Sequence, residues 1–436
     1  MIKNFYIDNL FNEKDVNIDF PEQYKILVSE NGCGKTTILN AFYSLVSGDL
    51  SRLRKIEFDN IGIVFDDDDI IWFTKEEINS INKRVYNFAK RMLGDNLSES
   101  RLHSLLDTVV NTDNGYSYNS SLIRDTSSEI NVSASRIHRT IKHIMEMDEY
   151  DFDIGAQKKI SQIKAKLDYD VLYLPTYRRV ERLVDGITVH DQNEGMNLQI
   201  NFGMADVEES IERITSEIKT SSIESFYKLN GQMLAQLVGD SSVTEDMKLN
   251  VINSPEIKIV LDRLSESIPL NHKNTILGLI DSHEILNSHD TLVYLLNELL
   301  KVYKQQADND AAIRDFSDSC NNYLNGKKII YDESTVTVKV VRNKNRSEVN
   351  LEDLSSGEKQ ILSIFSLLYL SRKNKLAIFF DEPELSLSIE WQKTLLPDIL
   401  SSGKCAFLLA TTHSPFIFAN ELKNNTVDLL HYVKEL

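Results

Sequence analysis

The sequence predicts an α/β protein, a mixed sheet with flanking helices that is split by long helical insertions. Short strand-like runs rich in β-branched and aromatic residues occur at both ends of the chain, within residues 3–28 and 376–410. Two of these runs lead directly into loops that carry glycine and lysine or acidic side chains. The residues between them, mainly 75–167 and 205–324, have the apolar spacing and high charge of helices, and we expect them to form an arm or a dimerisation region.

Composition fits a globular chain with ample core. Of 436 residues, 42% are hydrophobic and 26% are charged, and this length favours two or three domains. The chain has only 16 glycines and 7 prolines and no Pro-rich or Gly/Ser-rich linker. We therefore expect domains inserted into one another rather than joined end to end.

Charge and cysteine content exclude some classes of protein. A formal net charge of −18 argues against a surface coated with cations for non-specific DNA binding, although a local basic groove is still compatible. Cys33, Cys320 and Cys405 are far apart and form no C-x-x-C, which excludes a cysteine-based zinc site or disulfide framework. The chain starts with a strand-like segment, and no apolar run approaches the roughly 20 residues of a membrane helix. We expect a soluble cytoplasmic protein that does not enter a membrane.

The first part of the chain reads as strands 3–7, 16–20 and 24–28, followed by a small-residue loop and by a helix that continues to Gly48. Two further β-rich runs, 56–65 and 70–74, flank four consecutive aspartates at 66–69. These aspartates could hold a metal, but neighbouring carboxylates on a turn point apart, so we favour a solvated hairpin turn.

The middle of the chain is mainly helical. Residues 75–167 contain a Ser/Asn-rich break at 111–121 that reads as a loop, and a strand at 170–175 follows them. The next residues, 176–182, are a basic cluster that suits either a ligand site at a sheet edge or a solvated helix start. A seam of Val207, Ile211, Ile214 and Ile218 lasts about two heptads, too short for a coiled-coil rod but compatible with a helical arm or a dimer-contacting bundle. Strict alternation within 328–341 then predicts a β-hairpin.

The loop at residues 29–37 has the context of a phosphate-binding loop, because it lies between a buried strand and a helix. Its backbone N–H groups and the positive helix end can surround a polyphosphate, Lys35 can reach the outer phosphates, and Thr36 can hold Mg²⁺. The pattern G-x-x-x-x-G-K-[ST] has glycine where this chain has Ser29.

Three later motifs belong to the same kind of site. Ser355 and the following N–H groups open a helix and form a second anion site. The apolar strand at 376–380 ends in Asp381 and Glu382, which can place one carboxylate on Mg²⁺ and one on water. A last buried strand, 405–410, ends close to His413. Each motif alone has an ordinary structural explanation, but chance is a very poor explanation for all four motifs in this order.

With these motifs, residues 1–75, 165–185 and 345–436 resemble an ABC-type ATPase of the Rad50, SMC, RecF and OLD branch, including its AAA_21-type members. The resemblance implies an ABC-ATPase head with Walker A at 29–37, the signature motif at 354–360, Walker B at 379–382 and His413 as the switch histidine. In such proteins two heads dimerise head to tail, and each ATP lies between one Walker A loop and the partner's signature. The long separation of Thr37 from Leu354 fits a head split by insertions rather than a transporter subunit.

The resemblance assigns roles residue by residue. ATP and Mg²⁺ are the implied cofactors; Lys35, Glu382 and His413 would be catalytic, and Thr36 with Asp381 would hold the metal. The implied nucleotide-binding residues are Asn31, Gly32, Cys33, Gly34, Lys35, Thr36, Thr37, Ser355, Ser356, Gly357 and Glu358. Ser356 replaces one glycine of the usual L-S-G-G-Q, and Tyr177, Arg178 and Arg179 are the best substitute for a missing Q-loop glutamine.

The expected domain order follows the motifs. Residues 1–75 would form the N-terminal part of the head, 76–167 a helical insertion, and 168–185 a head strand with the Q-loop-like segment. Residues 186–326 would form a helical arm, and 327–436 the C-terminal part of the head.

The resemblance also bears on biological role. Little chain follows His413, so we expect no C-terminal Toprim nuclease; the arms are too short for Rad50 or SMC, and no zinc hook is present. Residues 173–179, 202–208 and 384–392 look similar to stand-alone ATPases of bacterial anti-phage systems such as PARIS, Septu and retron-associated ones. This likeness implies a sensor or scaffold ATPase that forms a homodimer or larger homo-oligomer and controls a separate Toprim or HNH nuclease, with a phage-derived trigger. The alternatives are a RecF-like repair ATPase that binds DNA directly and an ATP-binding scaffold with little turnover.

Overall fold

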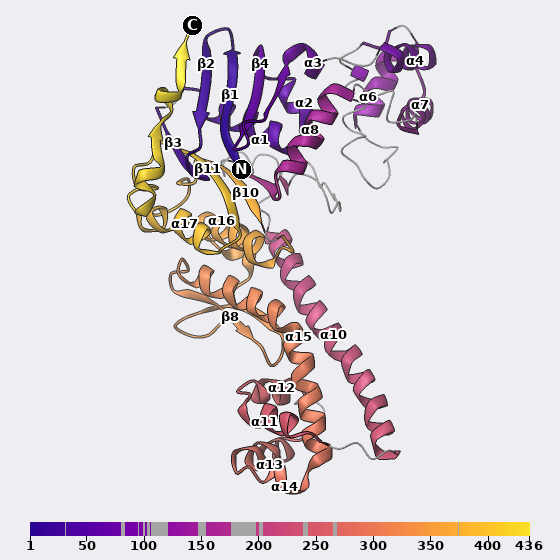
Figure 1. Ribbon diagram of the computed structural model, residues 1–436, viewed down its shortest axis with the longest axis vertical. Helices are drawn as coiled ribbons and strands as arrows, with labels where there is room; N and C mark the ends of the chain where they lie inside the picture. The colour runs from indigo at the N-terminus through magenta and orange to yellow at the C-terminus, as the bar shows by residue number, and fades with distance from the viewer. Residues whose placement is uncertain are drawn as a thin grey trace. The chain divides into compact units, whose positions relative to one another are not determined.

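The computed structural model describes residues 1–30, 32–79, 83–94, 96–98, 101–102, 105, 121–146, 154–175, 198–199, 204–238, 243–264, 268–373 and 375–436. The chain forms two compact units (Figure 1). The first combines Met1–Asn201 with Lys373–Leu436, and the second is Phe202–Arg372. No described helix combines the length and the apolar composition that crossing a membrane would require.

The first unit contains two sheets. The five-stranded sheet is antiparallel throughout and has the order β13-β2-β1-β4-β5. Its strands are β1 (Ile2–Leu10), β2 (Lys14–Asp19), β4 (Asn60–Phe65), β5 (Ile70–Thr74) and β13 (Val433–Glu435). The β4–β5 hairpin confirms the turn interpretation of the aspartate run, because Asp66 pairs with the N-terminus, Asp68 with Lys3, and both Asp67 and Asp69 with Lys166.

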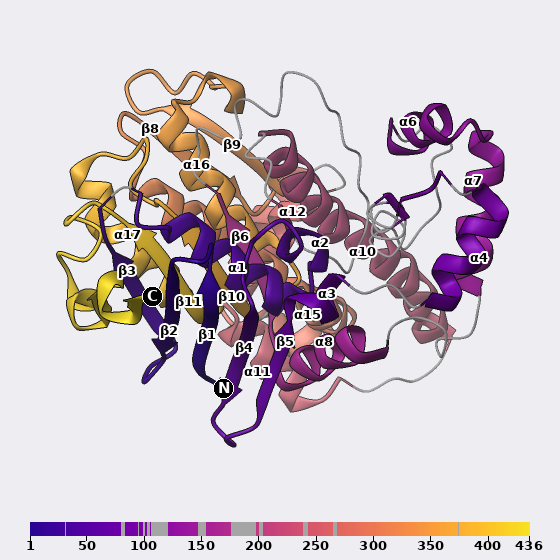
Figure 2. The same ribbon diagram turned by 90° about the horizontal axis from the view of Figure 1, so that it is seen from above.

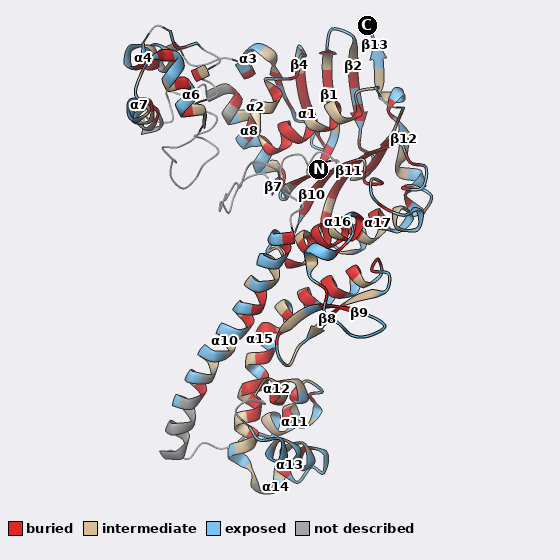
Figure 3. Ribbon diagram, turned by 180° about the vertical axis from the view of Figure 1, so that it is seen from behind, coloured by how far each residue is buried: buried red, intermediate tan, exposed pale blue. Residues whose placement is uncertain are grey.

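The six-stranded sheet has the order β12-β3-β11-β10-β6-β7, and all its described pairings are parallel. Its strands are β3 (Tyr24–Val28), β6 (Asp170–Leu174), β7 (Leu198–Gln199), β10 (Leu376–Asp381), β11 (Cys405–Thr412) and β12 (Thr426–Asp428). β10 is buried along its whole length, as a parallel strand covered on both faces should be (Figure 3). In its register Asp381 lies opposite Thr411 on β11, and Thr412 lies opposite Val28 at the end of β3.

Helix α1 (Lys35–Ser47) joins the two sheets through an aromatic core. Its Phe42 stacks on Phe5 of β1 with ring centroids 4.2 Å apart, and meets the edges of Phe379 on β10 and Phe407 on β11 at 5.2 and 5.9 Å. Rings of this kind bury large apolar areas and fix the angle at which elements pack. The phosphate-loop helix is therefore anchored between both sheets, as Figure 2 lets the reader follow.

The other helices of the first unit are mostly short. They are α2 (Leu50–Leu53), α3 (Lys75–Asn79), α4 (Lys83–Leu93), α6 (Ser121–Ile130), α7 (Ala134–Glu146), α8 (Ile154–Lys166) and α17 (Ile389–Ser401). Helices α4, α6 and α7 share an apolar cluster that includes Ala89, Leu93, Ile123, Ile137 and Ile141. The predicted insertion after residue 75 thus has a small core of its own, and the break predicted at 111–121 lies outside the described residues except for Ser121, the first residue of α6.

Two long helices organise the second unit, α10 (Met204–Val238) and α15 (Asp290–Asn321), which pack against each other. Its other elements are α11 (Glu245–Asn253), α12 (Ile257–Arg263), α13 (Leu270–Asp281), α14 (Ile285–Ser288), β8 (Lys327–Asp332), β9 (Thr337–Arg342) and α16 (Ser356–Phe365). β8 and β9 form the predicted hairpin. Val207, Ile214 and Ile218 of the predicted seam are buried, so they pack inside the chain and are not a free dimer face.

The predicted fold class is confirmed: a mixed α/β head with flanking helices, into which helical segments are inserted. The compact units divide the chain at 201/202 and 372/373. The predicted C-terminal head segment, 327–436, therefore contributes to both units, with the signature helix α16 in the second and Walker B with His413 in the first.

Candidate functional site

The phosphate loop owes its shape to two glycines. Gly32 has φ +92° and Gly34 φ +88°, left-handed conformations that only glycine adopts without strain. Gly34 is the N-cap of α1, and no side chain caps that helix end. The first N–H groups of the helix therefore have no side-chain acceptor and are available to an anion. A Cβ at Gly34 would lie 3.2 Å from Lys14 Nζ, which in turn donates to the carbonyl of Cys33 at 3.1 Å.

Lys35 binds the backbone of the loop through its side chain. Its buried ammonium donates to the carbonyls of Ser29 at 2.6 Å and Glu30 at 2.9 Å. Ser29 supplies a carbonyl, and its φ is not in the left-handed region. The serine therefore replaces the first glycine of the motif without backbone strain.

The predicted Walker A and Walker B segments meet through a hydrogen bond. Thr36 Oγ1 donates to Asp381 Oδ1 at 3.2 Å, and Thr411 Oγ1 donates to the same oxygen at 2.8 Å. Asp381 is 1% exposed, at the end of β10. The parallel register of β10 and β11 causes this meeting, since it sets Asp381 opposite Thr411.

Glu382 follows in a left-handed conformation, with φ +50°, and its N–H donates to the carbonyl of Thr411 at 2.8 Å. Burial, together with the carboxylates of Asp381 and Glu384, raises the pKa of the Glu382 carboxyl above its ordinary value. A raised pKa makes a carboxylate a stronger proton acceptor, which suits a general base.

His413 lies beside two carboxylates, and the closer one was not predicted from the sequence. Its Nδ1 is 2.9 Å from Glu384 Oε1 and 3.9 Å from Glu382 Oε1, and its backbone N–H donates to Glu384 Oε1 at 3.0 Å. Glu384 is nearly fully buried, whereas the His413 ring is about half exposed. A carboxylate next to Nδ1 favours the proton there, which leaves Nε2 for a ligand.

A small network holds Glu384 and His413 in place. The hydroxyl of Ser414 donates to Gln392 Oε1 at 2.7 Å, and the amide of Gln392 donates to the carbonyls of Leu387 at 3.0 Å and Glu384 at 3.4 Å. Gln392 lies in the first turns of α17, where Ser388 is the N-cap. The loop after Walker B is therefore tied to the loop that carries His413.

The residues predicted to form the signature motif lie in the second unit, at the start of α16. Ser355 is the N-cap, and it forms a capping box with Glu358. Glu358 Oε2 accepts from the N–H and the hydroxyl of Ser355, each at 2.9 Å, and both its carboxylate oxygens accept from Lys327 at 2.8 Å. Burial opposes the charge of Glu358, but the bonds from Lys327 and Ser355 outweigh it and lower the pKa of this carboxyl. Glu358 thus orders the helix end, while Ser355 and Ser356 are exposed and Gly357 is buried.

The predicted residues therefore fall into two groups. Lys35, Thr36, Asp381, Glu382 and His413 belong to the first unit, with Gly32, Cys33, Gly34 and Thr37 on the same loop and helix. Ser355, Ser356, Gly357 and Glu358 belong to the second. Asn31 lies outside the described residues, as do the Q-loop-like Tyr177, Arg178 and Arg179.

Lys14 and Glu384 are the residues that the sequence did not single out. Lys14 begins β2, some twenty positions before the loop it touches, and only the pairing of the strands brings it there. Glu384 did carry a signal, since it is the third acid of Asp-Glu-Pro-Glu at the end of a buried strand. Its contact with His413 follows from the parallel pairing of β10 with β11.

A family model described as an AAA ATPase domain, AAA_15, matches residues 1–418. The chain belongs to the AAA ATPase domain family. The match spans the phosphate loop, both acidic residues after β10 and His413, so these residues lie within the domain that defines the family. No curated protein matches this AAA ATPase.

Among solved structures, this AAA ATPase is similar to three Smc heads. The Smc head domain with an extended coiled coil bound to the C-terminal domain of ScpA, from Pyrococcus furiosus, is 11% identical with a TM-score of 0.36, covering 100% of this chain and 96% of that one. The SmcHead bound to the C-winged helix domain of ScpA is 11% identical with a TM-score of 0.33, and the match covers 100% of this chain and 97% of that one. The Smc head domain with a coiled coil and joint, from Pyrococcus yayanosii, is 12% identical with a TM-score of 0.31, and the match covers 96% of this chain and 93% of that one. The family assignment rests on the family match, not on these structures.

The residues present fit a magnesium ion. Thr36 and Asp381 bring a hydroxyl and a carboxylate oxygen together at 3.2 Å, and Mg²⁺ prefers oxygen ligands. Mg²⁺ in nucleotide sites is bound by one or two protein groups, with water and substrate phosphates completing its shell.

Proposed function

We propose that this AAA ATPase hydrolyses ATP at the site formed by the phosphate loop, Asp381, Glu382 and His413. The observation that carries the proposal is the bond from Thr36 to Asp381, 345 positions apart in the sequence, which joins the phosphate loop to the acidic end of β10. A purely structural role would not require this combination of side chains beside the uncapped N-terminus of α1. The combination consists of Lys35, Thr36, Asp381 and Glu382.

Each residue has a definite task in this proposal. Lys35 and the N–H groups of the loop contact the β- and γ-phosphates, as a helix N-terminus and a lysine do in phosphate loops. Glu382 accepts a proton from the attacking water, and His413 presents Nε2 to the γ-phosphate. Thr36 and Asp381 would hold Mg²⁺, which neutralises charge that develops on the phosphate oxygens.

We further propose that the site is completed by a second copy of the chain. Ser355 and Ser356 at the start of α16 are exposed, and the resemblance assigns this helix start to the γ-phosphate of an ATP bound by the other copy. ATP would then hold two chains together.

Two variants test the proposal. Lys35→Ala removes the ammonium from the loop, so calorimetry should find no ATP binding; unchanged affinity would contradict the assignment of the loop.

Glu382→Gln keeps the shape of the side chain but cannot take a proton, so it should accumulate an ATP-bound dimer in native mass spectrometry. If this variant hydrolyses no ATP but stays monomeric with ATP bound, the site is catalytic without a second copy.

For the biological role we propose a sensor or scaffold in an anti-phage system, where the ATPase controls a separate nuclease. The support is the resemblance of residues 173–179, 202–208 and 384–392 to ATPases of such systems. The net charge of −18 favours control of a protein partner over direct, salt-sensitive DNA binding. A neighbouring gene for a Toprim or HNH nuclease, whose product co-purifies with this protein, is the expected finding. Tight DNA binding by the protein alone, lost at higher salt, would point instead to a repair ATPase.

A further inference from the structure

A cavity of about 360 Å³ lies within the second unit, between α10, α12 and α15. Its volume falls in the range of about 300–1,000 Å³ that is typical of small-molecule sites. Every residue that lines it belongs to the second unit, whereas the phosphate loop and Walker B belong to the first. The lining of the cavity therefore includes none of the residues proposed for hydrolysis.

The cavity has an apolar side and a polar side. Val260, Leu299 and Val302 contribute to the apolar side, and Val260 and Leu299 also belong to the hydrophobic core of the unit. Arg263, Gln306 and Ser222 provide the polar side. Polar groups that line a pocket within an apolar core are what small-molecule sites use to orient a ligand.

The polar side has more hydrogen-bond donors than acceptors. Arg263 donates Nε–H to the carbonyl of Glu333 at 2.8 Å, Nη1 to Gln306 Oε1 at 3.1 Å and Nη2 to Asp310 Oδ1 at 2.6 Å. A guanidinium has five N–H groups, so two have no acceptor among the described residues. The Gln306 amide donates one N–H to Ser222 Oγ at 3.1 Å and has a second N–H, and its oxygen accepts from Arg263 at 3.1 Å. The Ser222 hydroxyl donates its single hydrogen to the carbonyl of Ile218 at 2.7 Å. A ligand with an acceptor oxygen could therefore satisfy donors that the described residues leave without a partner.

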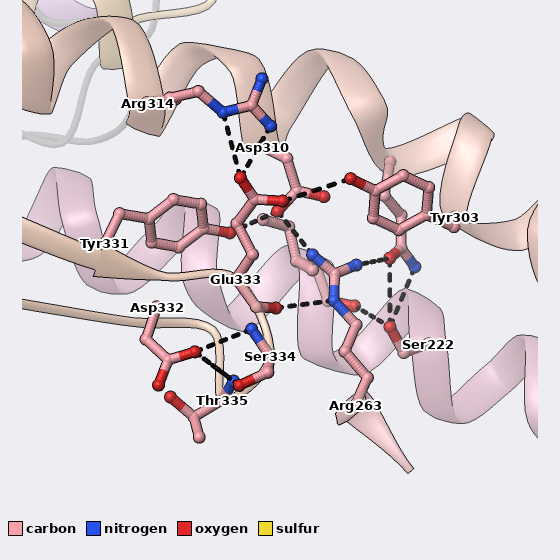
Figure 4. A network of polar contacts seen from close by, with 12 residues as sticks. Ser222, Arg263, Tyr303, Asp310, Arg314, Tyr331, Asp332, Glu333, Ser334 and Thr335 are labelled. Atoms are coloured by element: carbon pink, nitrogen blue, oxygen red, sulfur yellow. Dashed lines mark hydrogen bonds and ion pairs between the residues drawn. The ribbon is translucent and has the colours of Figure 1, made fainter. Parts of the chain in front are cut away.

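The charges around Arg263 already balance. Figure 4 shows its guanidinium directed at Asp310 and at the backbone of Glu333, beside Tyr303 and Ser222. Asp310 is fully buried, and its Oδ1 also accepts from the Tyr331 hydroxyl. Arg314 in turn pairs with Glu333. Two cations thus face two carboxylates. A ligand anion added here would lose its hydration without gaining an unpaired counter-charge, which disfavours it.

Tyrosines at the cavity differ in exposure. Tyr303 is buried with its hydroxyl on Glu333 Oε2 at 3.2 Å, and burial raises the pKa of this hydroxyl to about 12, so it stays protonated. Tyr227 on α10 is 73% exposed, and its neighbour one turn earlier, Ile223, is 57% exposed. Both line the cavity, so apolar surface continues from the interior to the solvent.

We propose that this cavity binds a small neutral molecule with an apolar body and a carbonyl oxygen. The oxygen accepts from the remaining N–H groups of Arg263 and Gln306, and the body lies against Val260, Leu299 and Val302. The site is independent of ATP hydrolysis, and it would give the helical insertion a ligand of its own.

The first test compares two probes of nearly the same shape on the full-length protein. Benzamide is neutral and carries a carbonyl, whereas benzoate has the same ring and a negative charge. Ligand-observed NMR titration should show saturable binding of benzamide, with benzoate at least about tenfold weaker, or about 1.4 kcal/mol. Absence of saturable benzamide binding overturns the proposal, and benzoate binding as tightly as benzamide overturns the choice of a neutral ligand.

The second test locates the binding. Val302→Phe fills the cavity from α15 and should abolish benzamide binding, whereas Leu249→Phe, at an exposed position on α11, should leave it unchanged. Arg263→Lys keeps the charge beside Asp310 but loses the planar donors, so affinity should fall about tenfold. Thermal unfolding shows that each variant is folded. If the folded Val302→Phe and Arg263→Lys variants both bind benzamide with wild-type affinity, the cavity is not the site.

Discussion

Glu384 Oε1 lies 2.9 Å from His413 Nδ1 and also accepts the backbone N–H of His413 at 3.0 Å. One buried carboxylate oxygen therefore meets both the ring and the main chain of the same histidine. This arrangement fixes the orientation of the ring and favours the tautomer with its proton on Nδ1.

Glu384→Ala should lower the rate of ATP hydrolysis because the His413 ring loses its orientation and its preferred tautomer. Positioned proton-transfer groups contribute about 10²–10⁴-fold, and we expect the variant to lose about tenfold or more of kcat. Glu384→Gln keeps an acceptor oxygen, so it should recover part of the rate. Calorimetric ATP affinity should be nearly unchanged in both, and the double variant with His413→Ala should be no slower than His413→Ala alone. A fully additive loss would separate Glu384 from His413.

Gly34→Ala should weaken ATP binding for a reason that goes beyond strain. A non-glycine residue at φ +88° costs about 1–2 kcal/mol, and the methyl group would also press on Lys14 at the loop. Gly403→Ala is the matched control, because Gly403 has φ +70° with open space around its Cβ position. Thermal unfolding should show similar losses of stability in both variants, and calorimetry should show lost ATP affinity in Gly34→Ala alone. Equal ATP affinities would mean that the loop tolerates a Cβ.

Ser29→Gly would restore the usual first glycine of the motif, and we expect no gain in ATP affinity. The backbone at Ser29 is not left-handed, and its carbonyl, which any residue has, is what Lys35 binds. The added backbone freedom should lower stability by about 0.5–1 kcal/mol. Chemical denaturation and calorimetry measure the two effects. A clear increase in affinity would show that the serine side chain obstructs the nucleotide.

The Glu358–Lys327 pair should make the second unit sensitive to acid. Glu358 has a pKa lowered in the folded state, so it stabilises the fold above the pKa of an unfolded glutamate, and this contribution is lost as pH falls through the folded-state value. Lys327→Met should destabilise the protein at neutral pH by about 1–3 kcal/mol, since it leaves the buried carboxylate without its cation. The difference from wild type should shrink at low pH. A difference that stays constant from neutral to acid pH would contradict this account.

The sequence predicted those parts of the site that depend on local order. Strand, glycine loop and helix follow one another around Gly34, and the acids follow β10 directly, so a reader of the sequence can place them. It could not predict contacts that arise when strands pair, such as Lys14 on Cys33 or Glu384 on His413. It also could not predict which apolar face would be covered: Val207 and Ile218 belong to the predicted seam, which fitted a helical arm or a dimer contact, and both are buried in the folded chain.

The partners of the Thr36–Asp381 bond come from opposite ends of the polypeptide, and Thr411 completes the contact from further on still. β11, which separates β3 from β10 in the sheet, is also among the last strands in the chain. A ribosome therefore completes the phosphate loop long before it makes the strands that support it. A nascent or truncated chain carries the loop sequence but not the acids that face it, and ATP bound at the proposed site would stabilise only molecules whose translation has passed β11.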